Sequence, residues 1–198
     1  SFPAERDDEL SLLCAEAEFG AARNAFEEGR FRRAAAAFDR GVTAAEQTVY
    51  DTASLRARTA VYFHYLSGVS PTLSSDILPE SEVADARAFG DEFCEYYMAL
   101  DALENGRDGE VAAYLTRQEK SLYAARIRAL ILMKKEEYGQ AQEALEALFG
   151  NPKLSVGALL YEIFGDLDLC CRKNDDYKRA YEFAGSRMAL LERLLEES

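Results

Sequence analysis

The chain has 198 residues, of which 48% are hydrophobic and 30% are charged, and its formal net charge is −13. The hydrophobic share excludes a disordered chain, and the acidic balance argues against nucleic acid as a partner. No run approaches the roughly 20 apolar residues of a membrane span, so we expect neither a membrane protein nor a signal peptide. Only 4 prolines and 12 glycines interrupt windows rich in helix formers, which predicts an all-α fold.

The first predicted helix pair, residues 9–49, contains a pattern that recurs along the chain. A small residue, Ala22, precedes a turn at Gly29, an aromatic residue, Phe31, follows two positions after the turn, and Ala34 follows three positions later. Apolar residues then continue at steps of three or four, the spacing of one face of a helix. The pattern predicts two antiparallel helices joined by a short turn.

The second predicted pair, residues 52–89, follows the pattern least well. Asp51 or Thr52 is placed to cap a helix that runs through Leu66, and the pattern predicts the next turn at Gly68. The segment Ser67–Ser81 contains two prolines and five serines, which predicts a loop. We expect this loop to be an insertion, and a position across a binding face is the alternative.

Three further pairs are predicted over residues 91–119, 121–149 and 155–196, with turns at Gly106, Glu136 and Asp175. The matching residues are Ala99 and Ala129 at the small position, Tyr138 and Tyr177 at the aromatic position, and Ala141 and Ala180 at the alanine position. The final helix, to about Glu196, is long enough to cover the end of a helical array.

At these residues the chain resembles the tetratricopeptide repeat family, whose unit is a pair of antiparallel helices of about 34 residues. The resemblance implies a right-handed α-solenoid of about five irregular hairpins, forming a single domain over residues 1–198. It also implies a concave groove lined by the first helix of each pair.

Twelve side chains of the first helices are predicted to line this groove from their helical register. They are Phe19, Arg23 and Phe26 of the first pair, Phe93, Tyr96 and Leu100 of the third, Tyr123, Arg126, Leu130 and Lys134 of the fourth, and Arg172 and Lys173 of the fifth. The set is aromatic and basic within an acidic chain, which suits a peptide with apolar anchors and a carboxylate. The alternative for the aromatic residues is packing between helices.

No catalytic motif stands out in the sequence, so we do not expect an enzyme, a cofactor or a metal site. The one histidine, His64, is expected to pack in or beside the core. Asp166 and Asp168 are two residues apart on a predicted helix and so do not face each other, which makes shared metal ligation poor. The cysteines form no CxxC motif, which predicts free thiols in a reducing, cytoplasmic compartment; they are Cys14, Cys94, Cys170 and Cys171.

The function expected from these features is a non-catalytic protein–protein interaction scaffold that binds a peptide or partner segment in its groove. The partner is then a protein or peptide, and neither nucleic acid nor a membrane. An alternative is the sensory or regulatory half of a larger signalling or transcription-regulatory protein, because the chain begins at Ser1 close to its first helix. Self-association, through the acidic middle and the more basic last helix, is a further alternative.

Overall fold

The structure, a computed structural model, describes residues 2–70 and 92–197, with side chains from residue 7 onward. Within these ranges it contains nine α-helices and no strand, so the predicted all-α class is confirmed. The second helix expected in residues 52–89, and residues 71–81 of the expected loop, lie outside the described residues. The chain divides into two compact units, one containing the described residues up to Cys94 and the other Glu95–Glu196.

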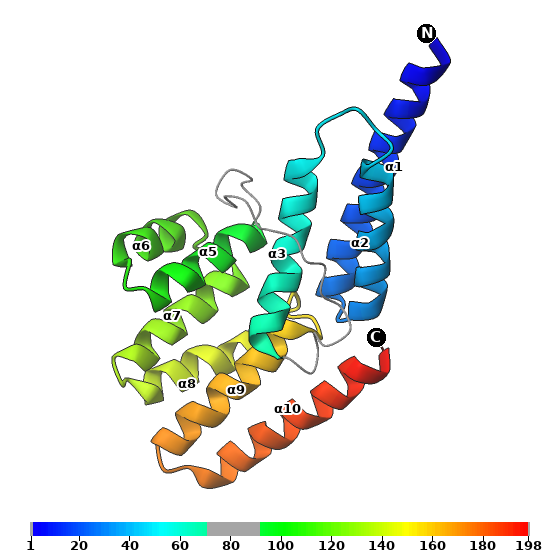
Figure 1. The fold of residues 1–198 in the computed structure, drawn as a ribbon. Helices are drawn as coiled ribbons and strands as arrows, with labels where there is room; N and C mark the ends of the chain where they lie inside the picture. Colours follow the sequence, from blue (N-terminus) through cyan, green and yellow to red (C-terminus); the bar gives the residue numbers. More distant parts are fainter. Residues whose placement is uncertain (1, 71–91, 198) are drawn as a thin grey trace. The chain divides into compact units, whose positions relative to one another are not determined.

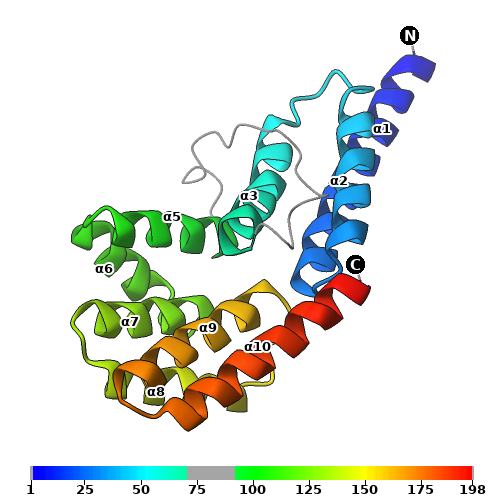
Figure 2. The same cartoon turned by 60° about the horizontal axis from the view of Figure 1, so that its bottom comes forward.

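The first unit contains α1 (Phe2–Glu27), α2 (Phe31–Ala45), α3 (Ala53–Val69) and the beginning of α5 (Glu92–Glu104). Helices α1 and α2 lie side by side in opposite directions, and α3 packs against α1 (Figures 1 and 2). The two long helices of the first predicted pair are therefore present. The first of them begins seven residues earlier than predicted.

Aromatic rings fill the core of the first unit. The rings of Phe19 and Phe38 join α1 to α2 with centroids 5.5 Å apart, and Tyr62 of α3 stacks on Phe93 at 4.0 Å. A Cβ atom added at Gly41 would lie 2.8 Å from Cδ1 of Phe19. Because glycine has no such atom, α2 can approach the buried Phe19 ring this closely.

The second unit contains most of α5 and the helices that follow it. They are α6 (Asp108–Arg117), α7 (Leu122–Lys134), α8 (Tyr138–Glu146), which a 3₁₀ turn (Ala147–Gly150) extends, α9 (Ala158–Lys173) and α10 (Tyr177–Glu197). Helices α7 and α8, and likewise α9 and α10, lie side by side as antiparallel pairs (Figures 1 and 2). The fourth and fifth predicted pairs are thus present.

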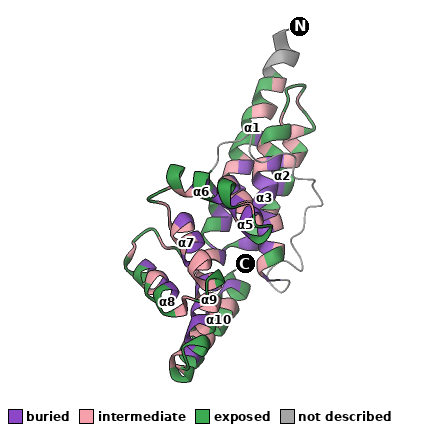
Figure 3. Ribbon diagram, turned by 90° about the vertical axis from the view of Figure 1, so that its left-hand side faces the viewer, coloured by how far each residue is buried: buried purple, intermediate pink, exposed green. Residues whose placement is uncertain are grey.

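A core of small and branched residues joins α7, α8 and α9. It includes Ala129 of α7, Ala141 and Leu145 of α8, and Ile163 and Leu167 of α9, all fully buried. The two alanines occupy the predicted small and alanine positions, where a larger side chain would separate the helices. Along α8 the buried and the exposed residues lie on different sides of the helix, whereas the residues of α7 and α9 are mostly buried or half-buried (Figure 3).

Four of the five predicted turn positions are confirmed by the backbone. Gly29, Gly106, Glu136 and Asp175 have φ angles of 74°, 69°, 62° and 60°. In each turn the next residue donates its N–H to the carbonyl five positions earlier, for example from Arg107 to Ala102 at 2.8 Å. A left-handed residue followed by this hydrogen bond is the Schellman motif that commonly ends a helix.

The turn predicted at Gly68 is wrong. Gly68 lies inside α3, which continues to Val69, and the N–H of Ser70 still donates to the Leu66 carbonyl at 3.0 Å. A glycine inside a helix costs only about 1 kcal/mol relative to alanine, so the buried Tyr65 and Leu66 can hold the helix past it.

The residues after each confirmed turn also follow the predicted order. The second helix begins two residues after the turn, and the residue three positions later is buried in every pair; these buried residues are Ala34, Val111, Ala141 and Ala180. Two predicted caps are present as well, because Asp51 accepts from the N–H of Ala53 at 2.9 Å and Asp176 from that of Arg179 at 3.1 Å. The solenoid arrangement and its handedness stay predictions.

None of the described helices combines the length and the apolar character that crossing a membrane requires.

Candidate functional site

A buried arginine lies at the centre of the second unit. Arg126 of α7 is only 5% exposed and stands ten residues before the turn at Glu136. Tyr96 of α5 stands ten residues before the turn at Gly106, so the repeat places both side chains at the same position of successive first helices. Glu162 and Asp166 of α9 are four residues apart and therefore share one face of that helix.

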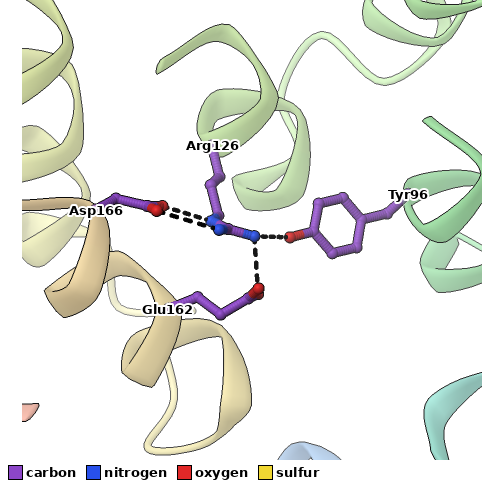
Figure 4. Close-up of polar contacts among 4 residues, drawn as sticks. All are labelled: Tyr96, Arg126, Glu162 and Asp166. Carbon is purple, nitrogen blue, oxygen red and sulfur yellow. Dashed lines mark hydrogen bonds and ion pairs between the residues drawn. The ribbon is translucent and has the colours of Figure 1, made fainter. Parts of the chain in front are cut away.

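These four side chains form one polar cluster, which we call the Arg126 cluster (Figure 4). Nη1 of Arg126 donates to Oη of Tyr96 at 2.6 Å and to Oε2 of Glu162 at 2.8 Å. Nε donates to Oδ2 of Asp166 at 2.8 Å, and Nη2 lies 3.4 Å from Oδ1 of the same carboxylate. The arginine therefore connects the first helices of three successive pairs, α5, α7 and α9.

The cluster holds two carboxyl groups against one guanidinium. Burial raises the pKa of Glu162 well above its ordinary value, and the nearby Asp166 raises it further while Arg187 opposes the shift. Burial disfavours the charge of Arg126, but Tyr96 and Asp166 outweigh burial, so the pKa of this guanidinium is raised. Burial also raises the pKa of Tyr96. The environment of the cluster thus favours the charge of Arg126 and disfavours ionisation of Tyr96 and of Glu162.

Arg187 of α10 is a second cation near Glu162. Its Cζ lies 4.2 Å from the ring centroid of Tyr161, a cation–π contact, and its charge lowers the pKa of Glu162. A Cβ atom added at Gly165 would lie 2.9 Å from this Cζ, so the glycine leaves room for the arginine against α9. Nε of Arg187 is buried and has no hydrogen-bond partner among the described residues.

The hydrogen bonds of the Arg126 cluster join three helices, α5, α7 and α9. A guanidinium does not lose its proton in proteins, so Arg126 cannot serve as an acid or base. Within the described residues, no group of three His, Cys, Asp or Glu side chains is placed to hold a metal. Asp166 faces Arg126, whereas Asp168 pairs with Arg172 at 2.7 Å, so the two carboxylates face different partners.

Five of the twelve residues predicted to line a groove are buried. They are Phe19, Phe26, Phe93, Tyr96 and Arg126, each 5% exposed or less. Phe26, for example, packs edge-on against Tyr62 with centroids 5.0 Å apart. These side chains lie between helices and are not accessible to a partner. The structure therefore shows the alternative expected for the aromatic residues, which is packing between helices.

The other seven predicted residues are half-buried or exposed. Arg23, Leu100, Tyr123 and Leu130 are half-buried, and Lys134, Arg172 and Lys173 are exposed. Arg23 donates to Oγ1 of Thr59 at 3.0 Å, and Tyr123 packs on Tyr96 with ring centroids 4.6 Å apart. Lys134 donates to the Leu103 carbonyl. Six of these seven belong to the second unit, and Arg23 belongs to the first.

Three leucines lie at the same distance before a turn on successive first helices, and two of them were predicted to line the groove. Leu100 and Leu130 each stand six residues before a turn, and so does Leu169 of α9, which is 42% exposed and was not predicted. We call Leu100, Leu130 and Leu169 the leucine row. Counting back from each turn would have found Leu169. Glu162 and Asp166 were not predicted either. Their four-residue spacing, which puts two carboxyl groups on one face of a helix, is the sequence feature that could have indicated them.

No protein-family model, no curated protein and no solved structure matches the chain. The likeness to tetratricopeptide repeats therefore rests on the repeat residues alone, and the family stays a prediction. Any function must be inferred from the geometry of the described residues.

Proposed function

We propose that the chain is a non-catalytic protein–protein interaction scaffold whose first helices bind a peptide or a segment of a partner protein in a concave groove. The leucine row is the observation that supports this proposal. It offers an accessible apolar side chain at one repeat position on three successive first helices. Evenly spaced apolar anchors are what a bound helix or extended peptide needs.

The Arg126 cluster supports the same proposal by holding the three helices in register. Its hydrogen bonds join α5 to α7 through Tyr96 and α7 to α9 through Asp166. The leucine row lies four residues beyond Tyr96 and Arg126 on α5 and α7, one helical turn away. The buried cluster thus positions the helices that carry the binding surface, and it does not itself contact the peptide.

Basic residues near the ends of these helices indicate the chemistry of the partner. Lys134 and Lys173 each stand two residues before a turn, and Arg172 stands beside the second of them. All three are exposed, although Arg172 also pairs with Asp168 and Lys134 donates to the Leu103 carbonyl; the chain as a whole carries a net charge of −13. A local basic end beside an apolar row favours a peptide that combines apolar side chains with a carboxylate.

Selection of random linear peptides displayed on phage against the purified chain tests this function. Enriched peptides would be synthesised and titrated against the wild-type chain and a Leu130→Ala/Leu169→Ala variant. We expect the variant to lose at least about tenfold in affinity, since each leucine contact is worth about 1.5–3 kcal/mol when fully buried.

Leu13→Ala is the matched control, because Leu13 is a 59% exposed leucine in the first unit. It should bind the same peptides as the wild type does, and circular dichroism should show that all variants keep their helices. Peptides that bind the double variant as tightly as the wild type would contradict the assignment of the leucine row. Failure to enrich any peptide over an unrelated protein would contradict the function.

A further inference from the structure

The last helix carries an exposed apolar stripe that the proposed function does not use. Tyr177, Tyr181 and Met188 of α10 are 65%, 82% and 56% exposed. Ala184 and Leu191, at half-buried positions, complete the series. We call these five residues the α10 stripe.

The spacing of the α10 stripe is that of a coiled-coil seam. Its members follow one another at steps of four, three, four and three residues, so they form a continuous line along one side of the helix. Scattered exposed apolar residues are normal on soluble proteins, but a line with this period is the arrangement that pairs with another helix.

The α10 stripe is separate from the face by which α10 packs on its own chain. That inner face includes the buried Ala180 and Leu190 and Arg187, which lies over the Tyr161 ring. It also includes Phe183, whose ring centroid lies 6.4 Å from that of Phe164 of α9. The helix is therefore apolar on two neighbouring sides, and the described residues of its own chain pack against only one of them.

The second helices of two other pairs do not share this property. The exposed residues of α2 include Arg32, Arg33 and Asp39, and those of α8 include Gln140 and Glu143. Neither helix contributes an exposed large hydrophobic side chain. The side of a helix that faces water is expected to be polar, as it is in α2 and α8, and α10 departs from this expectation.

We propose that the α10 stripe is the surface by which two copies of this chain associate, with the two α10 helices antiparallel. The charged residues beside the α10 stripe indicate that its partner is a second copy of the chain. In a heptad whose seam is the α10 stripe, Lys178, Gly185 and Glu192 form one flanking row, seven residues apart. Antiparallel pairing of two such rows places Lys178 of each copy opposite Glu192 of the other.

In a parallel pair the two flanking rows would lie on opposite sides of the seam, so Lys178 of one copy would not face Glu192 of the other. The chain is therefore complementary to itself in the antiparallel direction. Both side chains are exposed, and neither forms an ion pair within the part of the chain that the structure describes. A two-fold dimer needs this kind of self-complementary surface.

Gly185 lies at the middle of the flanking row and is exposed. A Cβ atom added to it would meet nothing within 4 Å among the residues that the structure describes, so none of their contacts accounts for the glycine. In the antiparallel pair it faces Gly185 of the other copy at the two-fold axis. Two glycines at that point allow the helix backbones to approach closely.

Sedimentation equilibrium of the purified chain, over about a hundredfold range of concentration, tests the association. We expect a monomer–dimer equilibrium. Met188→Glu, which puts a charge within the α10 stripe, should weaken it at least about tenfold. Leu13→Glu is the control, because it adds the same charge at an exposed leucine of the first unit and should leave the equilibrium unchanged.

Exchange of the two charges tests the antiparallel direction. Lys178→Glu or Glu192→Lys alone should weaken the dimer, because each creates two like-charge contacts. The double variant Lys178→Glu/Glu192→Lys should restore it, since the pairs reform with their signs exchanged. All four residues tested on α10 and α1 are exposed, so loss of folding is not expected, and circular dichroism would verify it.

Monomers at every concentration would overturn the proposal and assign the α10 stripe to another occupant. A dimer that Met188→Glu leaves intact would overturn it too, because the copies would then meet elsewhere. A dimer that Met188→Glu weakens but the double charge variant does not restore would overturn the antiparallel arrangement. None of these results depends on peptide binding at the leucine row.

Discussion

Arg126 illustrates how one residue position can be foreseen while its environment cannot. The helical register predicts that Arg126 and Tyr96 face the same way on neighbouring first helices, and the structure joins them by a hydrogen bond. The burial of Arg126 depends on Glu162 and Asp166, which are 36 and 40 residues away in the chain. The spacing of residues within one helix does not reveal which residues of another helix they contact. The sequence around Arg126 therefore cannot distinguish a buried arginine from an exposed one.

Replacement of Arg126 by methionine should strongly destabilise the second unit. The variant keeps much of the side-chain volume but leaves the two carboxyl groups buried without their cation. Breaking a buried ion pair in this way costs about 3–5 kcal/mol. Urea denaturation followed by circular dichroism would measure the loss.

Arg172→Met is the control for this prediction. Arg172 pairs with Asp168 four residues earlier on the same helix, but its side chain is 59% exposed. Exposed pairs of this kind contribute about 0.3–0.5 kcal/mol. Equal losses in the two variants would mean that Arg126 is no more important than a surface arginine.

Glu162 should make the stability of the chain fall as the pH rises. Its pKa is raised in the folded chain, so above about pH 4.3 the unfolded chain loses this proton first and is stabilised relative to the folded one. The loss of stability is complete only above the raised pKa of Glu162 in the folded chain. Glu162→Gln removes the titration, so the variant should match the wild type in acid and exceed it in stability near neutral pH.

Thermal unfolding of both proteins over a range of pH would test this, with the exposed Glu143→Gln as the control. The control should follow the wild type at every pH, because an exposed carboxylate meets water in both states. If the difference between Glu162→Gln and the wild type did not change with pH, Glu162 would not be the group responsible.

At the scale of helices, the turn positions were the most predictable feature of this chain. Gly29, Gly106, Glu136 and Asp175 were placed from local spacing alone, because a helix end is determined by a few neighbouring residues. The burial of Phe19 and Phe26 was not predictable in the same way. An aromatic residue on an amphipathic face fits a groove or an interhelix contact equally well, and tertiary packing decides between them.

Two of the turns use a residue that disfavours the required backbone. Glu136 has a φ of 62°, a left-handed conformation that costs an ordinary residue about 1–2 kcal/mol and glycine almost nothing. Glu136→Gly should therefore stabilise the chain by about 0.5–1 kcal/mol. Gly106→Ala, at a φ of 69°, should destabilise it by about 1 kcal/mol.

Chemical denaturation would measure both changes, with Gly109→Ala as the control in the helix after Gly106. Neither Gly106 nor Gly109 has any atom within 4 Å of an added Cβ, so the two differ in backbone conformation alone. Gly109→Ala should be neutral or stabilising because alanine favours helices. The same response at both positions would rule out backbone strain as the cause.

The molecule as a whole distributes its four cysteines unequally between surface and core. Cys14 is exposed, whereas Cys94, Cys170 and Cys171 are buried. Burial, assisted by Asp166 and Cys171, raises the pKa of Cys170 to about 12, so its reactive thiolate is scarce at neutral pH. Iodoacetamide should therefore modify Cys14 first in the native chain.

Peptide mass spectrometry after brief alkylation would identify the modified residue, and labelling in denaturant should reach all four cysteines. Rapid labelling of Cys170 or Cys171 in the native chain would contradict the burial described for the second unit. Because Cys94 belongs to the first unit and Cys170 to the second, labelling during a denaturant titration would also follow the opening of each unit separately.

The Arg126 cluster has a consequence for how this chain can change in evolution. Helical repeat proteins commonly gain or lose whole repeats, because each repeat contacts only its neighbours through interchangeable apolar surfaces. Here the guanidinium of α7 takes its partners from α5 and α9, so deleting α7 and α8 would leave Tyr96, Glu162 and Asp166 without the group that joins them. We therefore expect loss of α7 and α8 to be tolerated poorly, and variation to arise in loops and helix lengths instead.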